Sequence, residues 1–412
     1  MVALHALTAA FLISQVCASA IPQQDVTVST TSSVVLPSVA ARSVEAAAAQ
    51  LEQLSSWAYN TSTDRLSEAK DKRHGCTLSK LRIRRDWRAF SAAEKKDYIK
   101  AVRCLQELPA RTPAHLAAGA KTRYDDFLAT HINQTLNIHY TGTFLAWHRY
   151  FIHQFEEALR EECGYRGNIP YWDWPSDAHS LEKSEVFDGS ETSMSGNGKY
   201  IPNQPDIVLT MEGAADIYLP TGTGGGCVTS GPFKDYTVNL GPAALMMPGG
   251  NQTAMSNPLD YNPRCLKRDL TTELIQRFAN HTSVMSLILG NNKIRDFQLV
   301  MQGVPGTGDI GVHGGGHYAM GGDPGRDVWV SPGDPAFWHH HGMIDRVWWL
   351  WQNLDRKNRQ DAIAGTDTFL NNPPSPNTTL DTMVDLGYAK GKPMKMRDLM
   401  STTAGPFCYV YL

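Results

Sequence analysis

The sequence lacks a strong charge of either sign. Its 412 residues contain 38 lysines and arginines against 41 aspartates and glutamates, which gives a formal net charge of −3. This near-neutral balance excludes the broad positive surface with which proteins hold nucleic acid. Beyond its start, the chain also lacks any apolar run that reaches the ~20 residues needed for a membrane-spanning helix. We therefore expect no nucleic-acid partner and no membrane association of the mature form.

The one long apolar stretch lies at the beginning of the chain. Residues 1–20 read MVALHALTAAFLISQVCASA and end in Ala18-Ser19-Ala20. Small residues at these positions are typical of the cleavage site of a secretory signal peptide. Ser14 and Gln15 interrupt the run, which disfavours a membrane anchor. The sequence therefore predicts a signal peptide over 1–20 and a secreted, extracellular protein.

Cysteine is scarce, with seven residues in the chain, and Cys17 would leave with the signal peptide. An even number in an oxidising compartment favours disulfides, whose pairing the sequence does not give. Asparagine-linked glycosylation is also expected in a secreted chain that carries Asn-x-Ser/Thr sequons. The six remaining cysteines are Cys76, Cys104, Cys163, Cys227, Cys265 and Cys408, and the sequons lie at Asn60, Asn133, Asn251, Asn280 and Asn377.

Strand signals are few and short, so the sequence predicts a mainly α fold. Residues 21–73 form an N-terminal segment that we expect to be partly disordered or helical, with the basic pair Lys72-Arg73 as a possible processing site. Residues 74–412 are expected to form one domain, with long Gly/Pro/Asn-rich loops between 180 and 265. Ser91 and Glu94 form a capping box before one helix. Helices are predicted over 43–58, 91–109, 122–131, 141–161, 271–290 and 335–352.

Histidine is the residue that is arranged unusually. His131, His139 and His148 form one spaced set, and His313 and His317 lie four residues apart, on one face of a helix. The trio His339, His340 and His341 follows. A zinc-protease motif would need Glu where Gly314 stands, and no helix carries the Glu-x-x-His pair of a di-iron bundle. All-imidazole ligation suits copper or zinc, and two such sets favour a pair of redox-active copper ions.

Two motifs extend these histidine sets. They are FLAWHRYF, in which His148 lies nine residues after His139, and DPAFWHHHGMIDRVWWLWQ. Together they resemble the two metal motifs of the type-3 copper proteins, which include tyrosinases, catechol oxidases, o-aminophenol oxidases and haemocyanins. The resemblance is strongest to short, secreted fungal members. It implies an antiparallel four-helix bundle that holds two copper ions, with O₂ as co-substrate and small phenols as substrates, and it makes 74–412 the catalytic domain.

The resemblance also assigns roles to residues. It implies that His131, His139 and His148 bind the first copper, and that His313, His317 and His341 bind the second. His340 would support the ligands, and the role of His339 stays open. Phe337 is one turn before His341 and should pack on it. Arg149 and Asp345 should form an ion pair between the two metal-bearing helices, and Tyr409-Val410-Tyr411 should meet Arg84 or Arg85.

Departures from the family pattern bear on substrate choice. No cysteine lies between Cys104 and Cys163, so no thioether to His139 is expected. Because the sequence stops right after Tyr411, we also expect no C-terminal lid of the kind that longer members carry. Gly314 stands where strong monophenolases often carry Asn, and only Gln302 or Asp309 could partly replace the missing base. Tyr318 could bond to or stack on a substrate ring.

These features predict an oxidase of o-diphenols or o-aminophenols with weak monophenol hydroxylation. The alternatives are a full tyrosinase with strong monophenolase activity and, in another class, a haemocyanin-like oxygen-binding protein.

Overall fold

The computed structural model describes residues 36–68, 75–210 and 215–412. The expected signal peptide and the Lys72-Arg73 pair lie outside these residues. Within them, no helix is long and apolar enough to cross a membrane.

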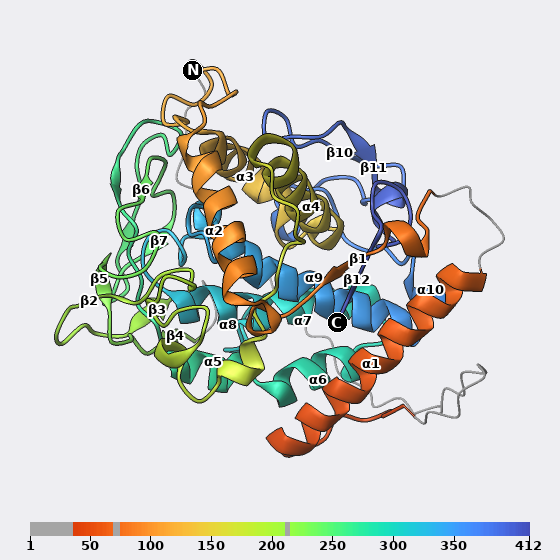
Figure 1. Cartoon of the computed structure of the whole chain (residues 1–412). Coiled ribbons are helices and arrows are strands. Elements are labelled where there is room, and N and C mark those ends of the chain that lie inside the picture. The colour runs from red at the N-terminus through yellow and green to blue at the C-terminus, as the bar shows by residue number, and fades with distance from the viewer. Residues whose placement is uncertain (1–35, 69–74, 211–214) are drawn as a thin grey trace.

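The fold is mainly helical, which confirms the predicted class (Figure 1). The α-helices are α1 (Val44–Glu68), α2 (Ala92–Glu107), α3 (Arg123–Ile138), α4 (Phe144–Cys163), α5 (Thr272–Phe278), α6 (His281–Gly290), α7 (Ile294–Gln302), α8 (Gly311–Met320), α9 (Phe337–Leu354) and α10 (Arg356–Arg359). Short 3-10 helices lie at Leu78–Lys80, Trp87–Ala89, Trp174–Asp177, Leu181–Lys183, Ser331–Gly333, Phe369–Asn371 and Met396–Leu399.

The strands are short and pair two by two. Parallel pairing joins β1 (Arg82–Arg84) to β12 (Tyr409–Tyr411). The other pairs are antiparallel: β2 (Gly198–Tyr200) with β5 (Gly225–Val228), β3 (Ile207–Leu209) with β4 (Ile217–Leu219), β6 (Thr237–Val238) with β9 (Arg264–Cys265), β7 (Leu245–Met246) with β8 (Gln252–Thr253), and β10 (Met383–Val384) with β11 (Met394–Lys395).

Helix ends follow local chemistry. The side chains of Ser91 and Glu94 form the expected capping box at the start of α2, and Thr122 with Asp125 forms another at the start of α3. The residues predicted as one helix over 271–290 instead form α5 and α6, so that prediction is wrong. The Asn280 side chain accepts a hydrogen bond from the Ser283 amide and caps α6, because asparagine competes with the helix for backbone groups.

Helix α9 forms the centre of the core. Every residue from Phe337 to Asn353 is buried, and the Trp338 ring stacks on Phe155 of α4 at 3.6 Å between centroids. Figure 1 shows α9 crossing the middle of the molecule, with α1 and α6 below it. Helix α1 buries Leu51, Leu54 and Trp57 and packs against α6 and α9. The boundary predicted at residue 74 stays a prediction, as does the antiparallel order of a four-helix bundle.

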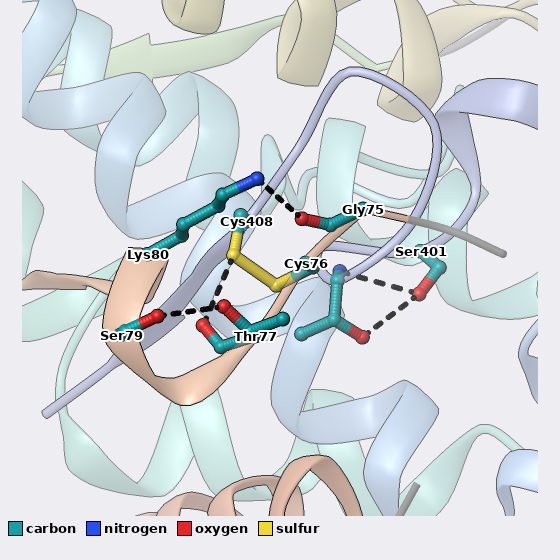
Figure 2. The surroundings of a disulfide bond; sticks show 8 residues. Gly75, Cys76, Thr77, Ser79, Lys80, Ser401 and Cys408 are labelled. Carbon is teal, nitrogen blue, oxygen red and sulfur yellow. Dashed lines mark hydrogen bonds between the residues drawn. A yellow bond between two sulfur atoms is a disulfide. The ribbon is translucent and has the colours of Figure 1, made fainter. Parts of the chain in front are cut away.

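Three disulfides join all six cysteines, which confirms the expected disulfide formation and supplies the pairing that the sequence does not give. They are Cys76–Cys408, Cys104–Cys163 and Cys227–Cys265. Figure 2 shows Cys76–Cys408, which lies next to the β1–β12 pair and ties the segment before β1 to the residue before β12. Cys104–Cys163 joins the end of α2 to the end of α4.

Candidate metal centre

Four helices bring the spaced histidines together in the interior. His131 lies within α3 and His139 ends it, His148 lies on α4, His313 and His317 lie on α8, and the paired histidines His340 and His341 lie on α9. All are buried. Their ring nitrogens form two groups in which the candidate ligand atoms all lie within 4.8 Å of one another.

In the first group, each ring is oriented by a backbone carbonyl. The Nδ1 atoms of His131, His139 and His148 donate to the carbonyls of Trp329 (2.9 Å), Thr135 (3.0 Å) and Phe144 (2.8 Å). A carbonyl can only accept, so Nδ1 holds the proton and Nε2 keeps its lone pair. This is the tautomer in which Nε2 can bind a metal ion.

The second group repeats this orientation in part. The Nδ1 of His317 donates to the Gly325 carbonyl at 3.2 Å, which leaves its Nε2 3.3 Å from the Nε2 of His341. His313 contributes a further Nε2 that is buried and has no hydrogen-bond partner. Two imidazole nitrogens at this distance fit the sharing of one metal ion, because each can direct a lone pair to the same point.

The two groups face each other. The ring of His148 stacks on that of His341 at 4.6 Å between centroids, with an interplanar angle of 18°. The ring centroids of His139 and His313 are 5.9 Å apart. Burial lowers the pKa of His139 to about 4 and that of His317 to about 3. The rings are therefore neutral at pH 7, which is the state that metal ligation requires.

The donor set fits copper. The Nε2 atoms of His131, His148 and His313 are buried without a partner, and such atoms carry a large desolvation cost unless something binds them. Each of the two groups consists of histidines alone. Imidazole ligands without carboxylates suit copper, whereas magnesium, calcium and manganese prefer oxygen.

The three consecutive histidines of α9 point to different surroundings. The ring of His341 lies between Phe337, 4.1 Å away, and His148. His340 also lies in the second group, 4.4 Å from the His317 ring, and a Cβ on Gly316 would overlap its ring. The ring of His341, and not that of His340, faces the first histidine group.

His339 takes no part in the centre. Its ring packs edge-on against Trp87 at 4.8 Å and Tyr98 at 5.2 Å, and both of its ring nitrogens are buried without a hydrogen bond. Burial lowers its pKa to about 3. The open question about His339 is thus answered, because it is a neutral aromatic side chain of the core.

The centre is most accessible on the α8 side. His313 and His317 are 6% and 7% exposed, and Gly314 and Tyr318 beside them are half-buried. Two glycines of the His313–His317 stretch are needed for packing and do not open an approach to the centre. A Cβ on Gly315 would come within 2.7 Å of the Phe278 Cβ, and Gly316 makes room for His340. Gly314 is the half-buried glycine of the three, and a Cβ on it would come within 3.0 Å of the Ile310 Cβ.

The two side chains that could replace the base near Gly314 both accept a hydrogen bond from a backbone amide. The Gln302 side chain accepts from the Tyr140 amide at 2.7 Å and donates to the Gln298 carbonyl at 3.1 Å. Asp309 is exposed and accepts from the Gly311 amide at 2.8 Å. Both side chains therefore hold the backbone around the centre.

A buried charge network holds α4 to α9, as the sequence predicted. Arg149 donates to the Asp345 carboxylate at 2.6 Å. The hydroxyls of Tyr409 and Tyr411 both donate to the other oxygen of Asp345 at 2.6 Å. Arg84, rather than Arg85, is the arginine that meets these tyrosines, with its guanidinium 3.6 Å from the Tyr409 ring centroid.

Sequence reasoning missed the segment 325–329. Its Gly325 and Trp329 carbonyls orient one histidine of each group. The Asp327 carboxylate accepts from the amides of Ala243 (2.7 Å), Ala244 (3.0 Å) and Trp329 (3.0 Å), and burial raises its pKa to about 6. Backbone carbonyls leave no mark in a sequence, so no motif could have revealed this role.

Comparisons with known proteins agree with this geometry. The family described as the common central domain of tyrosinase matches residues 121–354. Tyrosinase P of Aspergillus terreus is 43% identical over 330 residues, covering 80% of this chain and 91% of that protein. N-acetyl-6-hydroxytryptophan oxidase of Emericella nidulans is 39% identical over 349 residues, covering 82% and 93%. The structure of a mutant polyphenol oxidase from Thermothelomyces thermophila superposes with a TM-score of 0.82 at 44% identity, covering 88% of this chain and 97% of that one.

Proposed function

The chain belongs to the tyrosinase family of type-3 copper oxidases, which use a dicopper site and O₂, and from this premise we propose that it oxidises o-diphenols and o-aminophenols. In the diphenol reaction, two catechols and one O₂ give two o-quinones and two waters. Its hydroxylation of monophenols would be slow in comparison.

We assign one copper ion to each histidine group. His131, His139 and His148 would hold the first ion, and His313, His317 and His341 the second. The bound ions supply the two-electron chemistry with O₂. The chain supplies neutral imidazoles, four of which have their Nδ1 protons held by backbone carbonyls, together with a largely dry interior and access from the Gly314 and Tyr318 side. His340 would support the second group through its contact with His317.

The observation that carries the preference for diphenols is that, of the two described side chains considered as a base beside Gly314, Gln302 is a non-basic amide and Asp309 is an exposed carboxylate. Hydroxylation of a phenol begins with removal of a poorly acidic proton, and a positioned base contributes about 10²–10⁴-fold to such a step. Gln302 and Asp309 are both engaged with backbone amides. A diphenol or an aminophenol is more easily deprotonated and can chelate the centre, so it depends less on this help.

Full tyrosinase activity is the second candidate, and the relatives favour it. One of them is named tyrosinase, and another is named for N-acetyl-6-hydroxytryptophan, which has a single phenolic hydroxyl. A water held near the half-buried Gly314 could serve as a base in this case.

Oxygen consumption by the copper-loaded protein on phenol, catechol and o-aminophenol separates these functions. We expect fast turnover of catechol and o-aminophenol and at least 100-fold slower turnover of phenol. Phenol turnover at a similar rate without a lag would favour the full tyrosinase. Reversible O₂ binding without turnover of any of the three would show an oxygen carrier and overturn the oxidase.

We also propose that the protein is secreted. Three disulfides form among the described residues, and disulfides persist in oxidising compartments. Four of the five sequon asparagines are exposed, at Asn60, Asn133, Asn251 and Asn377. Fractionation of producing cells and their medium tests this, since retention of the protein in the cytoplasm would contradict it.

A further inference from the structure

Arg326 is an anomaly among the buried arginines. Seven arginines of the described residues are buried: Arg84, Arg123, Arg149, Arg268, Arg326, Arg346 and Arg359. Six of them donate to a side-chain partner, for example Arg268 to Asp334 at 2.6 Å and Arg359 to Asn292 at 2.8 Å. The guanidinium of Arg326 makes no hydrogen bond or ion pair within the described part of the chain, although the residue is only 8% exposed.

The two acidic residues whose charges act on Arg326, Asp323 and Asp269, are already engaged. The Asp323 carboxylate accepts hydrogen bonds from two nitrogens of Arg264, at 2.6 Å from Nε and at 2.8 Å from the second nitrogen. Asp269 accepts from the Gly224 amide at 3.1 Å. These carboxylates and Tyr318 favour the charged form of Arg326 electrostatically, while burial lowers its pKa. A buried guanidinium without a direct partner is costly, and a polar group of this kind calls for an explanation.

The position of Arg326 links it to the metal centre. It follows Gly325, whose carbonyl holds the His317 ring. Its charge acts on Tyr318, the residue that follows His317. Tyr318 and Gly314 lie four residues apart on α8 and therefore share the helix face at which the centre is most accessible. Arg326 thus adjoins the residue that orients His317 and lies within electrostatic reach of Tyr318 on this face of α8.

We propose that Arg326 binds a carboxylate carried by the phenolic substrate, so that the enzyme prefers acidic catechols or aminophenols. This inference rests on the proposed function and names its substrate class. A guanidinium is planar and offers parallel N–H groups that match the two oxygens of a carboxylate, and it stays charged when buried. A ring carboxylate bound at Arg326 would turn the opposite, hydroxyl-bearing edge of the ring toward the histidines. Arg326 is then a substrate-binding residue that sets specificity.

The test compares two substrates that differ in charge. They are 3,4-dihydroxybenzoate and 4-methylcatechol, measured with the copper-loaded wild type, Arg326→Gln and Arg326→Lys. A charge-assisted hydrogen bond contributes about 1.5–3 kcal/mol, which corresponds to about 10–150-fold. We expect Arg326→Gln to lose 10-fold or more in kcat/KM on the benzoate, mainly through a higher KM, and less than 3-fold on 4-methylcatechol. Arg326→Lys should lose less than Arg326→Gln, because lysine keeps the positive charge but lacks the two parallel N–H groups of the guanidinium.

Arg359→Gln is the matched control. Arg359 is also 8% exposed, and it bonds to the Trp351 carbonyl and Asn292 at the far end of α9. This variant should change thermal stability but not the ratio of the two kcat/KM values. Copper content is measured for each variant, so that a loss of metal is not mistaken for a loss of substrate binding.

The other outcomes are informative. If Arg326→Gln lowers kcat/KM equally for both substrates, or changes it for neither, the inference is overturned while the proposed function stands. If wild-type activity depends on chloride and Arg326→Gln removes only that dependence, then an inorganic anion occupies the position and the inference is again overturned. Failure of the wild type to oxidise 4-methylcatechol would instead overturn the proposed function. If Arg326→Gln does not fold, Arg326→Lys with the same two substrates decides, because a matching loss on both would contradict carboxylate recognition.

Discussion

Four of the six candidate ligands, His131, His139, His148 and His317, are oriented by the ring nitrogen that would not bind metal. The rings of His131, His139 and His148 donate through Nδ1 to carbonyls of three different segments. Such partners select the tautomer and the ring angle, and their loss commonly costs 10–100-fold in metal affinity or activity. Residue identity alone therefore does not make a ligand, and the neighbouring histidines of α9 show this directly. His341 faces the first group, whereas His339 faces Trp87 and Tyr98.

His339→Phe tests this separation through pH. The pKa of His339 is lowered to about 3 in the fold, against about 6.5 in the unfolded chain. Below pH 6.5 the unfolded chain binds a proton that the folded chain refuses, so this residue costs stability as the pH falls toward 3. As the pH is lowered from 6 to 4, the free energy of unfolding should therefore fall less steeply in the variant than in wild type. We expect the difference in slope to be up to about 1.4 kcal/mol per pH unit. Urea unfolding of the copper-free proteins measures this difference.

Copper content supplies the second half of that test. The variant should still bind two copper ions per chain, because the His339 ring lies outside both histidine groups. A loss of one copper ion would show that His339 belongs to the centre after all.

At the level of elements, one loop serves both histidine groups. The segment 325–329 holds His317 through Gly325 and His131 through Trp329, and the buried Asp327 carboxylate fastens the loop to the Ala243 and Ala244 amides. Three backbone donors share the two oxygens of this carboxylate. An asparagine of the same shape would place an NH₂ group against at least one of them.

Asp327→Asn should therefore loosen both copper ions. We expect their transfer to a chelator to become about 10–100-fold faster, in line with other residues that orient ligands. Asp125→Asn is the matched control, because Asp125 is also buried and accepts the Lys121 and Thr122 amides without holding a ligand carbonyl. It should lower stability and leave copper release unchanged. Equal release rates for the two variants and wild type would contradict the role of Asp327.

Elements were predictable from the sequence where short-range signals determine them. The capping box at Ser91 and the apolar faces of the helices predicted α2, α4 and α9, and the two motifs placed His148 on α4 and His341 on α9. The break at Asn280 was missed because the amphipathic pattern continues across it. The Asp327 and Arg326 contacts were missed for another reason. They depend on which distant backbone or side-chain groups come near, such as Ala243 and Tyr318, and tertiary packing alone decides this.

On the scale of the whole molecule, the N-terminal helix is part of the core. Leu51, Leu54 and Trp57 of α1 are buried, and Ser62 and Ser55 of the same helix bond to Asn353 and Arg346 of α9. Burying side chains of this size contributes about 1.5–3 kcal/mol each. A cut at Lys72-Arg73 would remove the covalent link between α1 and the main domain but none of these contacts.

We therefore expect α1 to stay bound after cleavage at that pair. Size-exclusion chromatography of the cleaved protein, followed by denaturing electrophoresis, should show both fragments in one peak. Leu54→Ala should lower the stability of the intact chain by about 2–5 kcal/mol, because it leaves a cavity in a packed interface, and it should release the fragment after cleavage. Glu52→Ala, on the exposed face of the same helix, should do neither. Separation of the wild-type fragments under native conditions would show that the contacts of α1 with α6 and α9 are too weak to hold it, and that the segment before residue 74 is a removable one.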